Sequence, residues 1–171
     1  MNNFFKNFLL LIFSIFVCEL AGVVGGLVTY SSIASGWYAG LVKPLFSPPN
    51  WVFGPVWTLL YFLMGVSLFL VVKSHKQYPY KLEFVRVLFV WVAGVIFFFV
   101  QLLFNIFWSI LFFGMKNPVY AFFDIVLLWI FIIVTIFAFA KISKPAAWLL
   151  VPYILWVTFA VYLNLMIVML N

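Results

Sequence analysis

The chain has 171 residues, of which 69% are hydrophobic and only 7% are charged, and its mean hydropathy is +1.31. These values exclude a soluble globular domain and indicate an integral membrane protein. The net charge of +6 would suggest nucleic acid in a soluble protein, but in a membrane protein it indicates basic loops on one face, so no nucleic-acid partner is expected. The single cysteine, Cys18, excludes a disulfide within the chain.

Five apolar runs follow one another along the chain, and each is long enough to cross a bilayer as a helix, which takes about 20 residues. They cover residues 8–29, 51–72, 84–113, 118–140 and 146–169. Residues 1–171 are therefore expected to form one all-α domain, a bundle of five transmembrane helices. A long structured loop at residues 30–50 joins the first two helices.

The first run also has features of a secretory signal peptide, because a lysine precedes an apolar stretch. Cleavage requires small residues just before the cut, but Phe16 and Val17 stand in front of Cys18. An uncleaved first helix is expected instead.

The distribution of basic residues predicts the orientation, because Lys and Arg gather in cytoplasmic loops. Two basic residues, Lys43 and Lys116, fall on the side of the first and third loops. This places the N-terminus in the cytoplasm and both the C-terminus and the 30–50 loop outside. The basic residues on the N-terminal side are Lys6, Lys73, Lys76, Lys81, Arg86, Lys141 and Lys144.

Within the first loop, the stretch WYAGLVKPLFSPPNW is unlike the apolar runs around it. Proline fixes φ, removes a donor and biases the preceding residue to extended backbone. The stretch is therefore expected to be a stiff, non-helical connector whose aromatic residues cover the mouth of a cavity, because irregular backbone is tolerated at a membrane only where protein or a cavity lies beneath it. The expected lid residues are Trp37, Lys43, Pro44, Pro48 and Pro49.

Three of the expected helices carry polar or aromatic residues at intervals of three or four, which places each set on one helix face. One interpretation is a shared cavity for a flat, apolar ligand. The other is ordinary helix packing, with amides that bond across helices. Spacing alone leaves both open. The stripes are Phe53, Trp57, Tyr61 and Gly65; Gln101, Asn105 and Trp108; and Pro152, Trp156, Ala160 and Asn164.

Two acidic residues, Glu19 and Asp124, fall inside apolar runs, where an ionisable group is costly. Each is either a ligand or proton site or a partner in a hydrogen bond between helices. Gly22 and Gly26 form a GxxxG pattern that indicates close helix contact. His75 lies in a charged loop with no ligand residues nearby, so no metal site is expected.

The stretch WYAGLVKPLFSPPNWVFGPVWTLLYFLMG resembles the signature of the TspO/MBR family, the tryptophan-rich sensory proteins and translocator proteins (peripheral benzodiazepine receptors). Two later blocks, NIFWSILFFGMKNP followed by AFFD, and LLVPYILWVTFAVYLN, resemble the same family. The resemblance implies a five-helix bundle, often a homodimer, whose ligand cavity is closed by the first loop. It implies ligands such as protoporphyrin IX and drugs of the isoquinoline or benzodiazepine type, with no required cofactor. The cavity positions that it implies are Tyr38, Trp57, Asn105, Trp108, Trp156 and Ala160, all but Tyr38 already on the stripes.

The chain departs from the animal members, which bind cholesterol through a motif with a basic residue after a tyrosine. Here Tyr162 is followed by LNLMIVMLN, which holds no Lys or Arg. Cholesterol is therefore not an expected partner. The usage of Phe, Ile, Lys and Asn suits a prokaryotic member in a cell membrane.

Three functions stay open at this point. The first is a membrane receptor or carrier for porphyrin-like tetrapyrroles, linked to tetrapyrrole or stress regulation. The second is an enzyme that breaks down bound porphyrin with light and oxygen, with Trp57 and Trp156 taking part. The third is a small-molecule transporter in which Glu19 and Asp124 couple protons.

Overall fold

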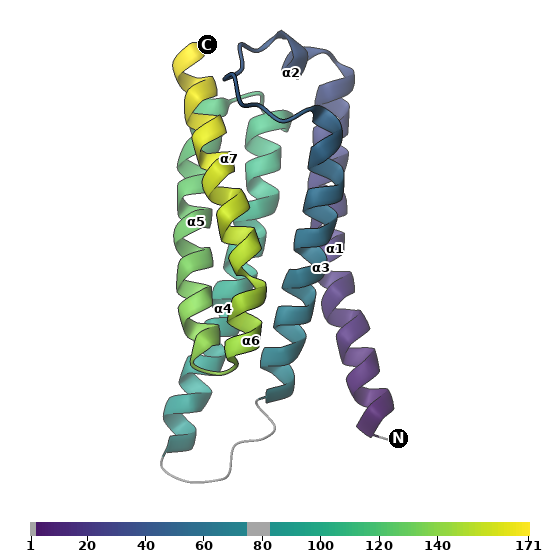
Figure 1. Ribbon diagram of the computed structural model, residues 1–171, viewed down its shortest axis with the longest axis vertical. Coiled ribbons are helices and arrows are strands. Elements are labelled where there is room, and N and C mark those ends of the chain that lie inside the picture. Colours follow the sequence, from purple (N-terminus) through teal and green to yellow (C-terminus); the bar gives the residue numbers. More distant parts are fainter. Residues whose placement is uncertain (1–2, 75–82) are drawn as a thin grey trace.

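The computed structural model describes residues 3–74 and 83–171, and the side chains of residues 83–87 are left aside. His75, Lys76 and Lys81, used above, lie outside the described residues. The described chain is helical, and five of its helical stretches are long and apolar enough to cross a membrane (Figure 1). The protein is therefore an integral, multi-pass membrane protein with the expected all-α architecture. The helices are α1 (Asn3–Ala34), α2 (Trp37–Gly40), α3 (Asn50–Ser74), α4 (Glu83–Ser109), η2 (Ile110–Gly114), α5 (Pro118–Ala140), α6 (Lys144–Leu149) and α7 (Val151–Leu170).

Helix α1 is longer than the run predicted at 8–29 and continues to Ala34. Its last turns are polar, but their hydroxyls bond back to carbonyls of the same helix: Ser31 Oγ donates to Val28 O at 2.8 Å and Ser35 Oγ to Ser32 O at 2.8 Å. The loop expected at residues 30–50 therefore starts after Ala34. It is also not wholly irregular, because Trp37–Gly40 forms a short helix, α2, and Asn50 already belongs to α3.

The fifth span, expected at 146–169 as one helix, is interrupted between α6 and α7. Pro152 has no backbone N–H, so the regular helical bond to the carbonyl four residues earlier is missing here. The chain turns at Leu150, whose N–H donates to Ala147 O at 3.1 Å. The third span also changes geometry near its end, where η2 is a π-helix. Such wide turns are frequent at functional sites.

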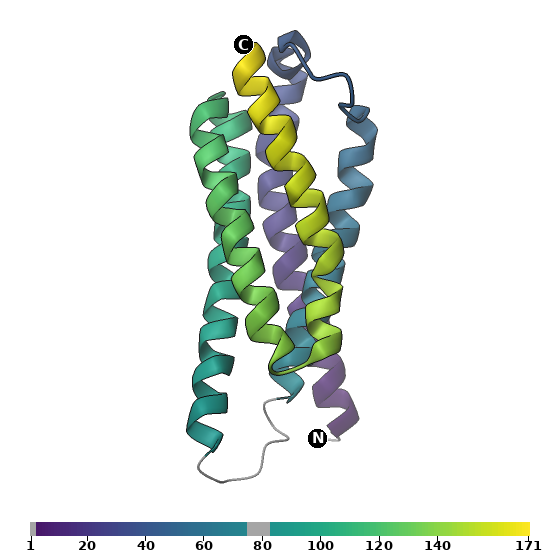
Figure 2. The same cartoon turned by 60° about the vertical axis from the view of Figure 1, so that its left-hand side comes forward.

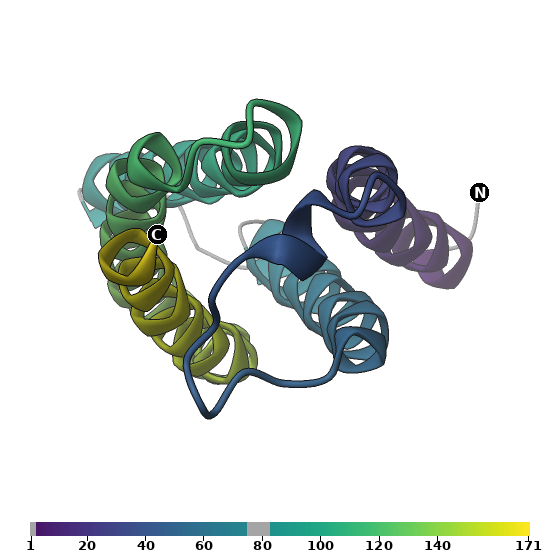
Figure 3. The same cartoon turned by 90° about the horizontal axis from the view of Figure 1, so that it is seen from above.

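The spans pack in two groups that meet around a central space. In one group α1 lies against α3, and in the other α5 lies against α4 and α7 (Figures 1 and 2). Seen from above, the segment with α2 crosses the bundle between α1, α3 and α7 (Figure 3). The C-terminus lies at this end and the N-terminus at the other (Figure 1). Many large apolar side chains on the outside of the bundle are exposed, as expected for surfaces that face lipid.

Helices α1 and α3 approach most closely at two glycines. A Cβ atom added to Gly65 would lie 2.5 Å from the Cα atom of Ile15, and one added to Gly22 would lie 2.5 Å from the Tyr61 ring. Toward the α2 end, by contrast, a Cβ added to Gly26 or Gly54 meets nothing within 4 Å. The two helices are therefore in tight contact near their middle and leave open space nearer the loop.

We expect Gly65→Ala to destabilise the protein by about 1–3 kcal/mol, because the added methyl group meets backbone that cannot turn away. Thermal unfolding of the purified protein in detergent measures the loss. Gly26→Ala is the matched control on the partner helix: its methyl group points into open space, so the melting temperature should stay unchanged or rise slightly. Equal melting temperatures for both variants would contradict the close contact.

Candidate functional site

A cavity of about 390 Å³ lies between the helices. It is beneath residues 35–49, which join α1 to α3 and contain α2; we call this stretch the α2 segment. This volume falls in the range of roughly 300–1,000 Å³ typical of small-molecule sites. Its wall is built by α1, α2, α3, α4, η2 and α7, whereas α5 packs behind α4 and α7 and contributes no lining residue. The structure therefore places one large aromatic cavity where the sequence stripes of the second, third and fifth spans converge.

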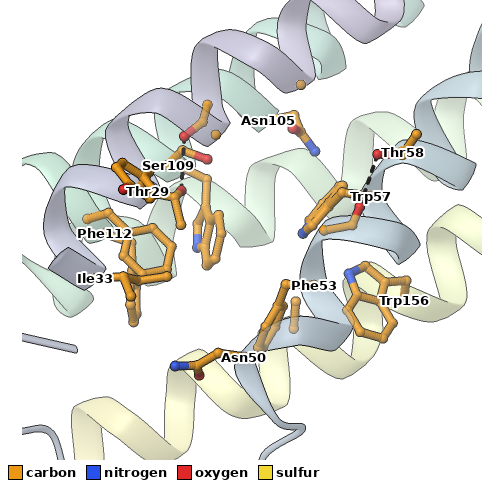
Figure 4. A pocket seen from close by; sticks show the side chains of 18 of the residues that line it. Thr29, Ile33, Asn50, Phe53, Trp57, Thr58, Asn105, Ser109, Phe112 and Trp156 are labelled. Carbon is orange, nitrogen blue, oxygen red and sulfur yellow. Dashed lines mark hydrogen bonds between the residues drawn. The ribbon is translucent and has the colours of Figure 1, made fainter. Parts of the chain in front are cut away.

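All six residues that were expected at the cavity line its wall. Tyr38 comes from α2, Trp57 from α3, and the others from α4 and α7. In Figure 4, Phe53, Trp57 and Trp156 face Ile33 and Phe112 across the open space. The six are Tyr38, Trp57, Asn105, Trp108, Trp156 and Ala160.

Trp57 and Trp156 are held by contacts with other rings, and both are half-buried. The Trp57 ring stacks on Tyr61 with centroids 5.5 Å apart and meets Tyr153 edge-on at 6.3 Å. The Trp156 ring meets Phe53 edge-on at 6.0 Å. The two indoles are thus fixed in orientation but keep accessible surface in the cavity wall, as a stacking site requires.

A buried chain of hydrogen bonds joins three spans at the inner end of the cavity. Tyr61 Oη donates to Asn105 Oδ1, Asn105 Nδ2 donates to Tyr153 Oη at 3.0 Å, and Tyr153 Oη donates to Gln101 Oε1 at 2.8 Å. The Nε2 atom of Gln101 has no partner in the described part of the chain. Asn105 therefore does two things: it lines the cavity and it ties α4 to α3 and α7.

Trp108 contributes shape rather than a hydrogen-bond donor. Its Nε1–H donates to Asn164 Oδ1 at 3.0 Å, and Asn164 Nδ2 donates in turn to the carbonyl of Pro118 at 2.8 Å. The Trp108 ring stacks on Phe112, with centroids 5.2 Å apart. Because this N–H is already used, a ligand meets only the ring of Trp108.

Tyr38 is the point where the α2 segment meets the cavity. It is buried, packs against Phe112 and Phe113 of η2 at 6.3 and 5.5 Å, and its burial raises the pKa of the phenol. The ammonium of Lys43 lies 4.2 Å from the centre of the Tyr38 ring, in the geometry of a cation–π contact. Trp37 meets Phe112 edge-on at 5.7 Å.

The five expected lid residues surround the cavity mouth without lining the cavity. Pro44 is buried and its carbonyl accepts from the N–H of Ser47 at 3.0 Å, while the carbonyl of Pro49 accepts from Val52 at 3.0 Å. These turns give the segment the stiffness expected from its prolines. The lid residues, none of which lines the cavity wall, are Trp37, Lys43, Pro44, Pro48 and Pro49.

The segment is also tied to the end of α7. Asn171 Oδ1 accepts from Val42 N–H at 3.0 Å, and Asn171 Nδ2 donates to Val42 O at 3.1 Å. The same Nδ2 donates to the carbonyl of Ile167 at 2.9 Å. The loop is thus held at both ends and at a third point between them.

Several lining residues were not among the expected site residues. The α1 wall is formed by Glu19, by the small residues Gly22, Gly25, Gly26 and Thr29, and by the larger Val23, Tyr30 and Ile33, and η2 adds Phe112 and Phe113. The spacing of Glu19, Gly22 and Gly26 by three and four residues marks one face of α1 and would have revealed this wall. Phe112 follows Trp108 by four residues and so continues the stripe of Asn105 and Trp108, whereas Phe113 falls outside that spacing.

The other intramembrane acid, Asp124, does not belong to the cavity. It is buried in α5, which contributes nothing to the wall, and its Oδ2 atom has no partner in the described residues. Nor does the described part of the chain bring together three His, Cys, Asp or Glu side chains that could hold a metal ion. Of these two acids, Glu19 lines the cavity and Asp124 does not.

The architecture and the site define a class: a five-span membrane protein with an aromatic cavity under the loop between spans one and two. Residues 14–170 match the sequence profile of the TspO/MBR family, and the chain belongs to this family. It is 46% identical to the tryptophan-rich protein TspO of Chlorobaculum tepidum over 97% of this chain and 98% of that protein. The TspO of Archaeoglobus fulgidus is 41% identical over 96% and 99%. The translocator protein of Ovis aries is 37% identical over 75% and 70%.

We expect Tyr153→Phe to lower the free energy of unfolding by about 1–3 kcal/mol, because it removes the donor to Gln101 and the acceptor for Asn105 in a buried place. Thermal unfolding in detergent measures the change. Tyr162→Phe is the matched control, since Tyr162 is exposed, and should leave the melting temperature unchanged. If both variants melt together, the chain of hydrogen bonds does not stabilise the bundle.

Proposed function

We propose that the protein is a membrane receptor or carrier that binds porphyrin-like tetrapyrroles such as protoporphyrin IX, and isoquinoline or benzodiazepine-type compounds, in the aromatic cavity. Membership of the TspO/MBR family supports a receptor-type function in a membrane. The observation that carries the proposal is the pair of half-buried indoles, Trp57 and Trp156, in the wall of one cavity capped by Tyr38. Large aromatic faces favour a ligand with an extended π-system, and each aromatic pair adds about 0.5–1.5 kcal/mol beyond the area it buries.

In this proposal each element has a role. Trp57 and Trp156 stack on the ring system, Asn105 bonds a polar edge of the ligand, and the α2 segment governs access from the non-cytoplasmic side. The N-terminus lies in the cytoplasm and the C-terminus outside, in the cell membrane of a prokaryote. A second copy of the chain forms the partner of a homodimer, and cholesterol is not an expected ligand, because the stretch LNLMIVMLN after Tyr162 holds no Lys or Arg.

The test is a titration of the purified protein with protoporphyrin IX, followed by quenching of tryptophan emission and by the porphyrin absorption band. We expect the double variant Trp57→Ala, Trp156→Ala to weaken binding at least tenfold, which corresponds to about 1.4 kcal/mol or more. Trp148→Ala is the matched control, because Trp148 is exposed and lies outside the cavity. Unchanged affinity in the double variant would reject the assigned site.

A second function, breakdown of bound porphyrin with light and oxygen, is favoured by one specific observation. Trp57 contacts two tyrosines, Tyr61 by stacking and Tyr153 edge-on, so three oxidisable side chains lie together beside the cavity. The pigment itself would supply the photochemistry, and these side chains would exchange electrons with it.

Illumination of the complex in air separates this enzyme from a receptor. If the protein is this enzyme, we expect porphyrin to be lost and a discrete product to form. The rate of loss should fall at least tenfold in Trp57→Phe, because phenylalanine keeps an aromatic ring at this position but is harder to oxidise than tryptophan. The experiment follows absorbance and the products by mass spectrometry. Bleaching at the rate of free porphyrin in the same detergent would reject the enzyme function, and only the receptor function would remain.

A further inference from the structure

The charge on the cavity wall comes from a single residue. Among the described residues that line the cavity, Glu19 alone has a carboxyl group, and none has an ammonium or guanidinium group. It lies on α1, at the inner end, one helical turn before Gly22. Gly22 and Gly26 above it on the same face have no side chain, although Val23 also lines this part of the wall, and Glu19 itself is half-buried. An ionisable residue at this depth marks a functional site.

Glu19 has no hydrogen-bond or ion-pair partner within the described chain, unlike the two amides Asn105 and Asn164 of the cavity wall. Asn105, Tyr153 and Asn164 are all hydrogen-bonded to neighbouring helices. Glu19 takes part in no such bond and no ion pair between described residues, although it is half-buried. A charge in a low-dielectric place is stabilised only by a partner, and here the remaining source of a partner is whatever fills the cavity.

The neighbouring hydroxyl points to the same ligand chemistry. Tyr61 packs across Gly22, the residue one turn above Glu19, and it already donates its proton to Asn105. What Tyr61 offers to a ligand is therefore an acceptor oxygen. Glu19 and Tyr61 together make the inner end of the cavity rich in acceptors.

We propose that Glu19 is a specificity-determining residue that selects flat, apolar ligands whose inner end carries a cationic nitrogen or an N–H donor, and that disfavours a carboxylate at that end. The inference rests on the proposed function, because it takes for granted that the aromatic cavity binds such ligands. A ligand that also has acid groups binds with those groups toward the loop, where the ammonium of Lys43 lies over Tyr38. Glu19 and Lys43 thus give the cavity a polarity from inner end to mouth.

Three probes with one ring system and different charge test the inference: 1-pyrenemethylamine, 1-pyrenemethanol and 1-pyrenecarboxylic acid. The full chain is placed in nanodiscs of neutral phospholipid, and binding is followed by saturable energy transfer from tryptophan to pyrene. In Glu19→Gln we expect the amine to bind roughly tenfold or more weakly, because a buried charge pair is lost. The alcohol should change by less than about twofold, and the acid should bind more tightly. Comparing variants at one fixed probe removes the effect of partition into lipid.

Two further variants make the outcome specific. Glu19→Asp keeps the charge and should keep the preference for the amine over the alcohol. Asp124→Asn removes the other intramembrane acid, which lies outside the cavity, and should leave the affinity for all three probes unchanged. Equal weakening of all three probes in Glu19→Gln, or an unchanged amine, would overturn the inference while leaving the proposed function standing. If none of the probes binds saturably to the unaltered chain although protoporphyrin IX does, this inference fails and the proposed function stands; if protoporphyrin IX does not bind either, the proposed function fails.

Discussion

The hydrogen bonds from Tyr61 to Asn105 and from Asn105 to Tyr153 join α3, α4 and α7 at the inner end of the cavity. In lipid the apolar surfaces of helices gain little by leaving the solvent, so helix position depends on close packing and on polar bonds between helices. Gly65 of α3 is in close contact with Ile15 of α1, whereas Gly26 and Gly54, nearer the loop, meet open space. The cavity exists because the helices are fixed together at its inner end and spanned by the α2 segment at the other.

The same residues explain how far the sequence could be used to predict the structure. The five spans follow from hydropathy, and the stripes with Trp57, Asn105 and Trp156 follow from helical spacing, because both signals are local. What spacing could not decide was whether those stripes pack against one another or leave space. That depends on the distance between helices, which is set at Gly65 by contact with Ile15, 50 residues away in the sequence.

The misplaced boundaries have physical causes of another kind. The first span was predicted to end at residue 29, but the helix continues to Ala34, and the hydroxyls of Ser31 and Ser35 bond to carbonyls of that helix. The interruption at Leu150 was signalled by Pro152, yet an apolar run conceals a turn that keeps its residues in the membrane. Phe112 continues the helical spacing of Asn105 and Trp108, but the π-helix that contains it and Phe113 has no regular signal in the sequence.

The pair of hydrogen bonds between Asn171 and Val42 has a mechanical consequence. A side-chain amide that accepts from one residue's N–H and donates to its carbonyl restrains that residue along two directions, much as a neighbouring strand would. The cover of the cavity and the helix that carries Trp156 are therefore coupled. Any displacement of the segment large enough to uncover the ring of Tyr38 must either break both bonds together or drag the last turn of α7 with it. The position of the cover is thereby linked to the position of the last turn of α7.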